Sequence, residues 1–499
     1  MKRSLFPLAM TVALAMGTAA SAQTLRIGLN EDPDVLDPHR ARTFVGRIVF
    51  TSLCDKLIDI TPELKFVPQL ATEWTWTDPK TLTFKLRPGV KFHDGEPLNA
   101  AAVKANIDRA RTLPDSLRKS ELGSVESVEA VDDMTVALKL SRPDATLLSQ
   151  LSDRAGMMMS PKALASADFG QKPVCSGPFR FVERVQNDRI VLERFKDYWD
   201  AKDYNFEKVV FQPIPDTTVR LANLKAGNLD MLERLAPSDV AAVKQDSSLT
   251  FAPVSGIGYQ GLTINTNNGE RSKTPLGQDK RVRQALEYAI DRDVINEVVG
   301  QGIFPPAGQP FPEASPYNDK KFAAKKRDVE KAKKLLKEAG VDKVKFDLTF
   351  GTSTTTQQIA EIIQAMAAEA GFDISLRPTE FAAMQKEAQA GNFDVNVIGW
   401  SGRVDPDGNI HPFVTCKGGL NDGRYCNPEV DRLLNEARAV TDEAKRKELY
   451  DAAQTILQDE LPIIYNYYQP WPFVLAKKVQ GFRPYPDGMI RLKGVKFSS

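Results

Sequence analysis

The spacing of hydrophobic residues predicts hairpins in the first half of the chain. There, apolar and polar residues alternate with a period of two on either side of short turns, a pattern typical of antiparallel strand pairs. Three such stretches occupy 72–91, 125–140 and 177–195. A strand is also predicted at 24–29 and a helix at 47–58. The first half is therefore expected to be rich in antiparallel β-structure.

The second half has the pattern of alternating strands and helices. Strands are predicted at 344–350, 373–377 and 393–399, and helices between them at 357–370 and 381–390. Three further helices have capping residues at Asp279, Asp328 and Asn427, and Gly340 ends the second of these. This order implies a parallel or mixed sheet with right-handed crossovers. A chain of 499 residues is long enough for two or more cores.

The N-terminus has the features of a secretory signal peptide. Lys2 and Arg3 precede an apolar run at 5–16, and Ala20-Ser21-Ala22 fits the small-residue cleavage pattern. The run is too short to span a bilayer, which takes about 20 residues. We expect a soluble, exported chain that starts at Gln23. No cysteine for lipid attachment follows the signal, which favours an untethered protein.

Four cysteines fit an oxidising compartment. Cys54, Cys175, Cys416 and Cys426 allow three pairings, and sequence alone does not choose among them. We favour Cys416–Cys426, because the segment between them can turn back on itself, and this leaves Cys54–Cys175. Zinc is the alternative, but the spacings match no common zinc pattern and the chain has only three His.

Charge and motifs argue against several function classes. The formal net charge of +1 becomes −1 without Lys2 and Arg3, so nothing favours nucleic acid or an anionic membrane. The chain has no motif of the common nucleophile, zinc-protease or nucleotide sites. Asp405 and Asp407 stand two apart on one loop and cannot flank a glycosidic bond. We expect no enzymatic activity, cofactor or resident metal.

The loop after the strand at 393–399 is the first candidate ligand site. Ligands in open α/β sheets bind beyond the carboxyl ends of the strands. A Trp offers a stacking face, an Arg a bidentate donor and a carboxylate an acceptor. The loop carries Trp400, Ser401, Arg403, Asp405 and Asp407. The alternative is a surface loop in which Arg403 pairs with Asp405 or Asp407.

Several long segments match one known family almost from end to end. They include LATEWTWTDPKTLTFKLRPGVKFHDGEPLNAAAVKANIDR at 70–109, GPFRFVERVQNDRIVLERFKDYW at 177–199, DKRVRQALEYAIDRDVI at 279–295 and CNPEVDRLLNEAR at 426–438. The hairpin LRPGVKFHDG is the most specific of them. On these segments the chain resembles the bacterial extracellular solute-binding proteins of family 5, the peptide, opine and nickel receptors of ABC importers.

The resemblance implies an α/β fold, the two-lobed periplasmic binding protein of type II, cluster C-like, with an extra β-rich subdomain inserted in lobe one. It places the signal peptide at 1–22, lobe I at 23–65, 176–257 and 478–499, the insert at 66–175 and lobe II at 258–477. It further implies a periplasmic monomer that closes on a small-molecule or peptide ligand and docks on the permease subunits of the transporter.

The resemblance also bears on the ligand. Dipeptide-binding members carry an Asp after the GW strand that pairs with the ligand amine, whereas this chain has Arg403 at or next to that position. A cation there would repel an amine. The strand at 344–350 leads to Ser353, Thr354 and Thr355, before a helix N-terminus that favours anions or hydroxyl-rich ligands. We therefore expect a peptide-like, anionic or polyhydroxylated solute stacked on Trp400.

Other functions remain open at this point. The chain is also compatible with an ordinary di- or oligopeptide receptor, a nickel-chelate receptor using His411, or a chaperone that holds unfolded peptides. Tyr259 and Tyr468 are further candidates for cleft-lining residues, although aromatic residues in strands also serve as core or cross-strand pairs.

Overall fold

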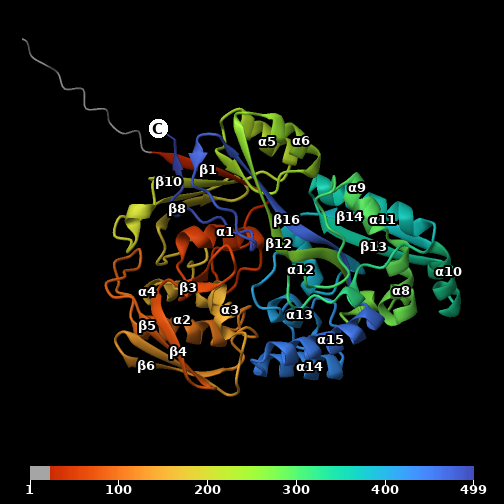
Figure 1. The fold of residues 1–499 in the computed structure, drawn as a ribbon, viewed down its shortest axis with the longest axis horizontal. Helices are drawn as coiled ribbons and strands as arrows, with labels where there is room; N and C mark the ends of the chain where they lie inside the picture. Colours follow the sequence, from red (N-terminus) through yellow and green to blue (C-terminus); the bar gives the residue numbers. More distant parts are fainter. Residues whose placement is uncertain (1–22, 499) are drawn as a thin grey trace, which may run out of the picture.

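The computed structural model describes residues 23–498, and the predicted signal peptide at 1–22 lies outside them. Two lobes lie side by side, joined by the long strands β12 (Leu249–Ile264) and β16 (Ile463–Ala476) (Figure 1). The two-lobed α/β architecture predicted from the sequence is confirmed. No helix within 23–498 is long and apolar enough to cross a membrane.

One ten-stranded sheet runs through both lobes. Its order is β14-β13-β15-β12-β16-β11-β1-β10-β9-β8. Lobe I supplies β1 (Thr24–Leu29), β8 (Phe179–Val185), β9 (Arg189–Arg194), β10 (Lys208–Pro213) and β11 (Met231–Leu232), and lobe II supplies β13 (Val344–Gly351), β14 (Phe372–Thr379) and β15 (Val395–Trp400). Strand β13 lies parallel to β14 and β15, as the alternating pattern predicts.

The two crossing strands are interrupted between the lobes. The register of β12 against β16 shifts between Ser255 and Tyr259, and no Cβ fits on Gly258, where it would lie 1.8 Å from the Trp400 carbonyl oxygen. Such interruptions weaken a ladder locally, so we expect bending between the lobes to concentrate there. The lobe boundaries at 257/258 and 477/478 remain predictions. Leu475, near the end of β16, pairs with Met231 of lobe I strand β11.

A separate small sheet forms the inserted subdomain. It contains β4 (Ala71–Asp78), β5 (Thr81–Leu86), β7 (Thr135–Leu140) and β6 (Val125–Asp132), in that order, and α2 (Ala100–Thr112) packs against it (Figure 1). Two of the predicted hairpins are confirmed here. The third, at 177–195, forms β8 and β9 at the edge of the large sheet. Short strand pairs are β2 (Ile58–Ile60) with β3 (Phe66–Pro68) and β17 (Val479–Gln480) with β18 (Lys496–Phe497).

The remaining helices are distributed over the two lobes and the inserted subdomain. They are α1 (Phe44–Leu53), α3 (Leu147–Leu151), α4 (Pro161–Leu164), α5 (Thr217–Lys225), α6 (Val240–Gln245), α7 (Pro275–Gln278), α8 (Lys280–Ala289), α9 (Arg292–Val298), α10 (Val329–Glu338), α11 (Thr354–Ala368), α12 (Phe381–Gln389), α13 (Asp407–Val414), α14 (Pro428–Ala439) and α15 (Glu443–Glu460). The predicted caps Asp279, Asp328 and Asn427 accept backbone N–H groups at the starts of α8, α10 and α14.

The helix predicted at 47–58 is too long. Helix α1 ends at Leu53, because Cys54 leaves the helical conformation and Ile58 already pairs in β2.

Cys54 is bonded to Cys175, and Cys416 to Cys426, so both favoured disulfides are confirmed and no cysteine is left for zinc.

The lobe I core unites residues from both ends of the described chain. Leu25 and Ile27 of β1 belong to the same buried cluster as Phe473 of β16 and as Ile490 and Leu492 beyond it. Lobe II and the inserted subdomain each have clusters of their own. The core of lobe I is thus completed only by β16 and the segment that follows it.

His39 and His411 are buried and His93 is half-buried, which leads to a prediction about pH. Burial lowers the pKa of His39 to about 3 and that of His93 and His411 to about 4. We expect none of the three imidazoles to titrate between pH 5.5 and 8 when ¹³C-labelled histidines are followed by NMR. In the unfolded chain histidine has a pKa of about 6.5, so the unfolded state takes up protons at a higher pH than the folded state. The free energy of unfolding should therefore fall as the pH drops from about 6.5 toward 4. An imidazole with a midpoint near 6.5 would contradict this assignment.

Candidate functional site

A cavity of about 440 Å³ lies between the two lobes. Its wall in lobe I includes Glu31 after β1 and Arg47 on α1, its wall in lobe II includes Ser353 and Trp400, and Trp471 of the crossing strand β16 also lines it. Several of these residues follow the carboxyl ends of strands, where ligands of open sheets bind. The volume suits a small molecule of the size of a short peptide.

Four of the predicted site residues border this cavity. Trp400 and Ser401 lie at the end of β15, and Ser353 and Thr355 lie at the start of α11. The Ser353 hydroxyl caps α11 by accepting the Thr356 N–H at 3.2 Å. Thr354 is the first residue of that helix and is not part of the cavity wall.

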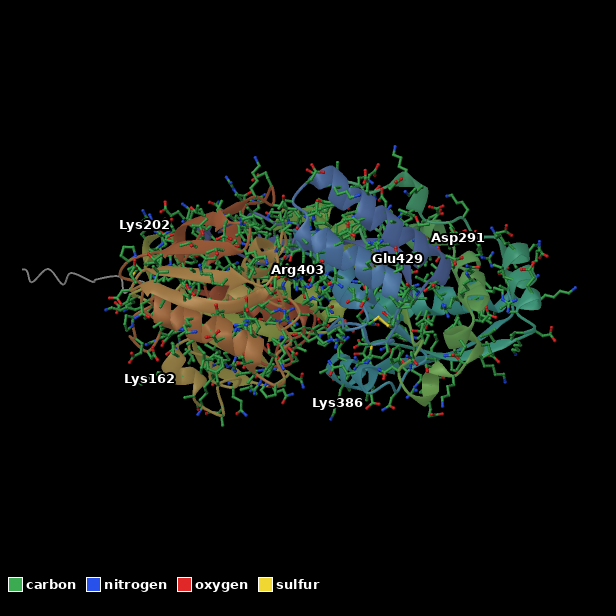
Figure 2. All side chains as sticks on the ribbon, turned by 90° about the horizontal axis from the view of Figure 1, so that it is seen from below. Lys162, Lys202, Asp291, Lys386, Arg403 and Glu429 are labelled. Atoms are coloured by element: carbon green, nitrogen blue, oxygen red, sulfur yellow. A yellow bond between two sulfur atoms is a disulfide. The ribbon has the colours of Figure 1, made fainter. Side chains whose placement is uncertain are left out.

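Arg403 lies directly behind the wall. Its Nε forms an ion pair with Asp153, 2.8 Å from Oδ2, and its guanidinium lies 4.2 Å from the centre of the Trp400 ring. Figure 2 shows Arg403 where the first half of the chain meets lobe II. Because Arg403 pairs with Asp153, the alternative pairing with Asp405 or Asp407 is wrong. One face of Trp400 is thereby covered.

The two aspartates of the loop are fully engaged within lobe II. Asp405 accepts two hydrogen bonds from Arg446, at 2.8 and 3.0 Å, and Asp407 accepts two from Arg438, at 2.8 and 2.7 Å. These buried, bidentate pairs are strong and directional. They hold the loop and α13 against α14 and α15, away from the cavity.

The remaining predicted residues also lie outside the wall. His411 has its Nε2 3.3 Å from Asn435 Oδ1 on α14. The Tyr259 hydroxyl donates to the Asn409 carbonyl, and the Tyr468 hydroxyl donates to the Phe311 carbonyl at 2.8 Å. Their contacts are those of packing residues.

Four buried guanidinium groups gather beside the cavity with only two carboxylates. We call this set the arginine cluster, and it comprises Arg47, Arg118, Arg154 and Arg403 with Asp153 and Glu121. Each of the four arginine side chains is at most 6% exposed. The formal charge of the cluster is therefore +2.

Arg47 and Arg154 bring the cluster to the cavity surface. Arg47 Nη2 lies 2.6 Å from Asp153 Oδ2, and its Nη1 donates to Ser401 Oγ at 2.7 Å. Arg154 Nη1 donates to the Ala41 carbonyl at 2.6 Å, whereas its Nε lies 3.8 Å from Asp153 Oδ1 and has no hydrogen-bond partner among the described residues. This corner of the cavity thus contains one guanidinium donor, Arg154 Nε, that makes no hydrogen bond within residues 23–498.

The pKa values of the cluster show the same excess of positive charge. Burial, together with the neighbouring Arg118, holds the pKa of Arg154 well below its usual range, and burial with Arg47 lowers that of Arg403 to about 10. Burial alone would raise the pKa of Asp153, but Arg403 and Arg47 hold it well below its usual range. An added anion would relieve the repulsion among the cations.

Sequence reasoning missed the arginine cluster, although one signal was present. Arg47 is the only charged residue in the helix FVGRIVFTSL, and an arginine inside an apolar helix seldom lacks a specific partner. Arg154 carries no comparable local signal. Its position follows from the packing of the inserted subdomain against both lobes.

Another part of the cavity wall is largely aromatic. Phe44 and Trp471 are stacked with ring centres 4.4 Å apart, and Arg234 lies 4.7 Å above the Phe44 ring. Tyr467 is stacked on Phe304 in the same way, at 4.3 Å. These rings provide apolar surface for the body of a ligand.

Comparisons with known proteins agree with this architecture. Residues 65–421 match the model of the bacterial extracellular solute-binding proteins, family 5. The glutathione-binding protein GsiB of Pectobacterium atrosepticum and the dipeptide-binding protein of Escherichia coli are each 30% identical, over 97% of this chain and 96% of theirs.

Solved structures show the same fold. The agropinic acid complex of the periplasmic binding protein AgaA from A. tumefaciens has a TM-score of 0.87 and 27% identity, over 95% of this chain and 99% of that one. A Pseudoalteromonas dipeptide-binding protein with bound Met-Leu has a TM-score of 0.88 at 24% identity, over 95% and 100% of the two chains. The chain belongs to the bacterial extracellular solute-binding proteins of family 5.

Proposed function

We propose that this chain is the periplasmic receptor of an ABC importer, and that it captures a small peptide-like solute with at least one carboxylate. The observation that carries the ligand class is the excess of two positive charges in the arginine cluster, at the cavity surface. Relatives are named for glutathione and dipeptides, and a solved neighbour holds agropinic acid. All of these are carboxylate-bearing compounds.

The carboxylate binds at the corner formed by Arg47, Arg154 and Ser401. Buried cations in excess of their counter-charges are costly, so an anion that enters this corner is favoured by charge and by the Arg154 Nε donor, which makes no hydrogen bond within residues 23–498. Ser353 and Thr355 offer hydroxyl groups on the lobe II side, and the aromatic wall contacts the ligand body. Arg403 holds Asp153 and acts as a positioning residue.

Closure and delivery follow from the two-lobed arrangement. Arg42 of lobe I and Asp422 of lobe II both border the cavity and form an ion pair across it. Closing the lobes brings such pairs together around the ligand, and the closed monomer then presents itself to the permease subunits. Binding and release involve no covalent step. The nickel-chelate alternative depends on His411, which does not border the cavity and whose Nε2 lies 3.3 Å from Asn435 Oδ1.

Replacing Arg154 by methionine tests the carboxylate corner. We expect Arg154→Met to weaken binding of anionic ligands by about 100-fold, because a buried charge partner contributes several kcal/mol. The unliganded protein should keep its stability within about 1 kcal/mol, since the substitution also removes repulsion inside the cluster. Arg154→Lys, which keeps the charge, should retain most of the affinity.

The measurement is a thermal-shift screen followed by calorimetry. The panel contains glutathione, N-acetylated and unblocked dipeptides, opines and nickel-histidine. A ligand at a hundredfold excess over Kd stabilises the folded state by about 2.7 kcal/mol. If every anionic compound fails to raise the melting temperature, or if Arg154→Met binds as well as the natural protein, the proposed ligand class is refuted.

A further inference from the structure

Three polar side chains form a row across the lobe II sheet. Thr349 on β13 is the register partner of Asn396 on β15, and Asn396 is the partner of Thr263 on β12. Directly opposed residues of neighbouring strands point to the same face, with Cβ atoms about 5 Å apart. The row is therefore continuous across three adjacent strands.

The row is buried and its oxygen atoms are unsatisfied. Thr263 is 9% exposed, and Thr349 and Asn396 are each 6% exposed. Thr263 Oγ1, Asn396 Oδ1 and Thr349 Oγ1 have no hydrogen-bond partner within residues 23–498. A buried polar atom without a partner costs about 1–3 kcal/mol, so native proteins seldom keep a row of them without a use.

Two members of the row reach the cavity. Thr263 and Asn396 border it, whereas Thr349 does not. We call their end of the cavity the lobe II recess, which is lined by Thr263, Asn396, Met384, Leu420 and Asp422. Asn268 joins the segment that carries Asp422 to helix α12, because its side-chain amide donates to the Asp422 carbonyl at 2.8 Å and to the Ala388 carbonyl at 3.3 Å.

The recess carries little net charge. Asp422 is its one acidic side chain, and this carboxylate is already bound by Arg42. Met384 and Leu420 are apolar. A charged ligand group would lose its hydration there without gaining a free counter-ion, and an apolar group would leave Thr263 and Asn396 unpaired.

We propose that the lobe II recess selects a ligand arm that ends in an uncharged, hydrogen-bonding group, a carboxamide or a hydroxyl. The Asn396 amide and the Thr263 hydroxyl can each donate and accept, so they match a group that does both. This subsite is distinct from the carboxylate corner and determines which anionic solutes bind. The inference rests on the proposed function, because it assumes that the cavity holds the ligand.

Matched pairs of N-acetylated dipeptides test the subsite by calorimetry. N-acetyl-Ala-Gln is compared with N-acetyl-Ala-Met, and N-acetyl-Ala-Thr with N-acetyl-Ala-Val, because the members of each pair are similar in size. A site built for hydrogen bonds rejects analogues that lack them. We expect the Gln and Thr compounds to bind at least about tenfold more tightly than their apolar partners.

Variants of the row identify the residues responsible. Thr263→Val and Asn396→Leu should each bring the affinity ratio close to one, while Thr349→Val, which changes the same row outside the cavity, should leave it intact. Melting temperatures check that each variant is folded. If Asn396→Leu does not fold, the isosteric variant Thr263→Val tests the subsite on its own.

The outcomes separate the two proposals. If the natural protein binds both members of each pair equally, or if neither variant changes the ratio, the recess proposal alone is overturned. If no acetylated dipeptide and no other anionic compound binds, the proposed function fails and the recess proposal fails with it. Arg154→Met should weaken both members of a pair and preserve their ratio.

Discussion

Asp153→Asn is expected to lower the free energy of unfolding by about 3–5 kcal/mol, the usual cost of removing one partner from a buried ion pair. Asp153 lies 2.6 Å from Arg47 and 2.8 Å from Arg403, and 3.8 Å from Arg154. An amide of the same size would leave three guanidinium groups packed together without their carboxylate. The repulsion that Asp153 now offsets would then oppose folding.

Chemical denaturation of the unliganded protein measures this loss. Asp188→Asn, which breaks an ion pair with Arg189 on the surface, is the matched control and should cost less than about 1 kcal/mol. Combining Asp153→Asn with Arg154→Met should recover part of the stability, because one cation is removed with the anion. A loss below about 1 kcal/mol for Asp153→Asn alone would show that the cluster is not held by this charge.

Removing the Cys54–Cys175 disulfide, by changing both residues to alanine, is expected to cost about 5 kcal/mol. A disulfide restricts the unfolded chain, and the restriction grows with the loop it closes. This bond joins residues 121 positions apart, whereas Cys416–Cys426 spans only 10. The same relation gives about 3 kcal/mol for the shorter loop.

The two double-alanine variants are compared by denaturant midpoint, under conditions in which the other disulfide stays intact. Cys54 and Cys175 are both buried in the lobe I core, so two alanines there also lose packing contacts and widen the difference. If removal of the short loop cost as much as removal of the long one, the entropy of the unfolded chain would not explain the stabilisation.

Local features of the fold could be predicted from the sequence, and long-range pairings could not. The caps at Asp279 and Asp328 act within three residues of their partners, so their effect is visible in a short window. The alternating elements from β13 to β15 have clear hydrophobic periods. The pairing of β1 with β11 joins Gly28 to Leu232, about two hundred residues away, and no local pattern specifies it.

The same division applies to the site. Trp400, Ser401, Ser353 and Thr355 follow strand ends, and the topological rule for open sheets finds them. Asp153 meets Arg403 only because the inserted subdomain packs against lobe II, so the sequence could suggest for Arg403 only a ligand or, as the alternative, a partner on the same loop. Asn396 did have a signal in the sequence, since it is a polar residue within the largely apolar strand VNVIGW.

The long-range contacts of the lobe I core have a consequence for the proposed export. Leu25 and Ile27 are made at the start of synthesis, but their partners at 473–492 are made more than four hundred residues later. Contacts so distant in sequence form slowly, and here they cannot form at all until the chain is nearly finished. A nascent lobe I therefore stays open for most of its synthesis. A chain that must be threaded through a membrane in extended form is helped by this delay, because it cannot fold prematurely on the wrong side.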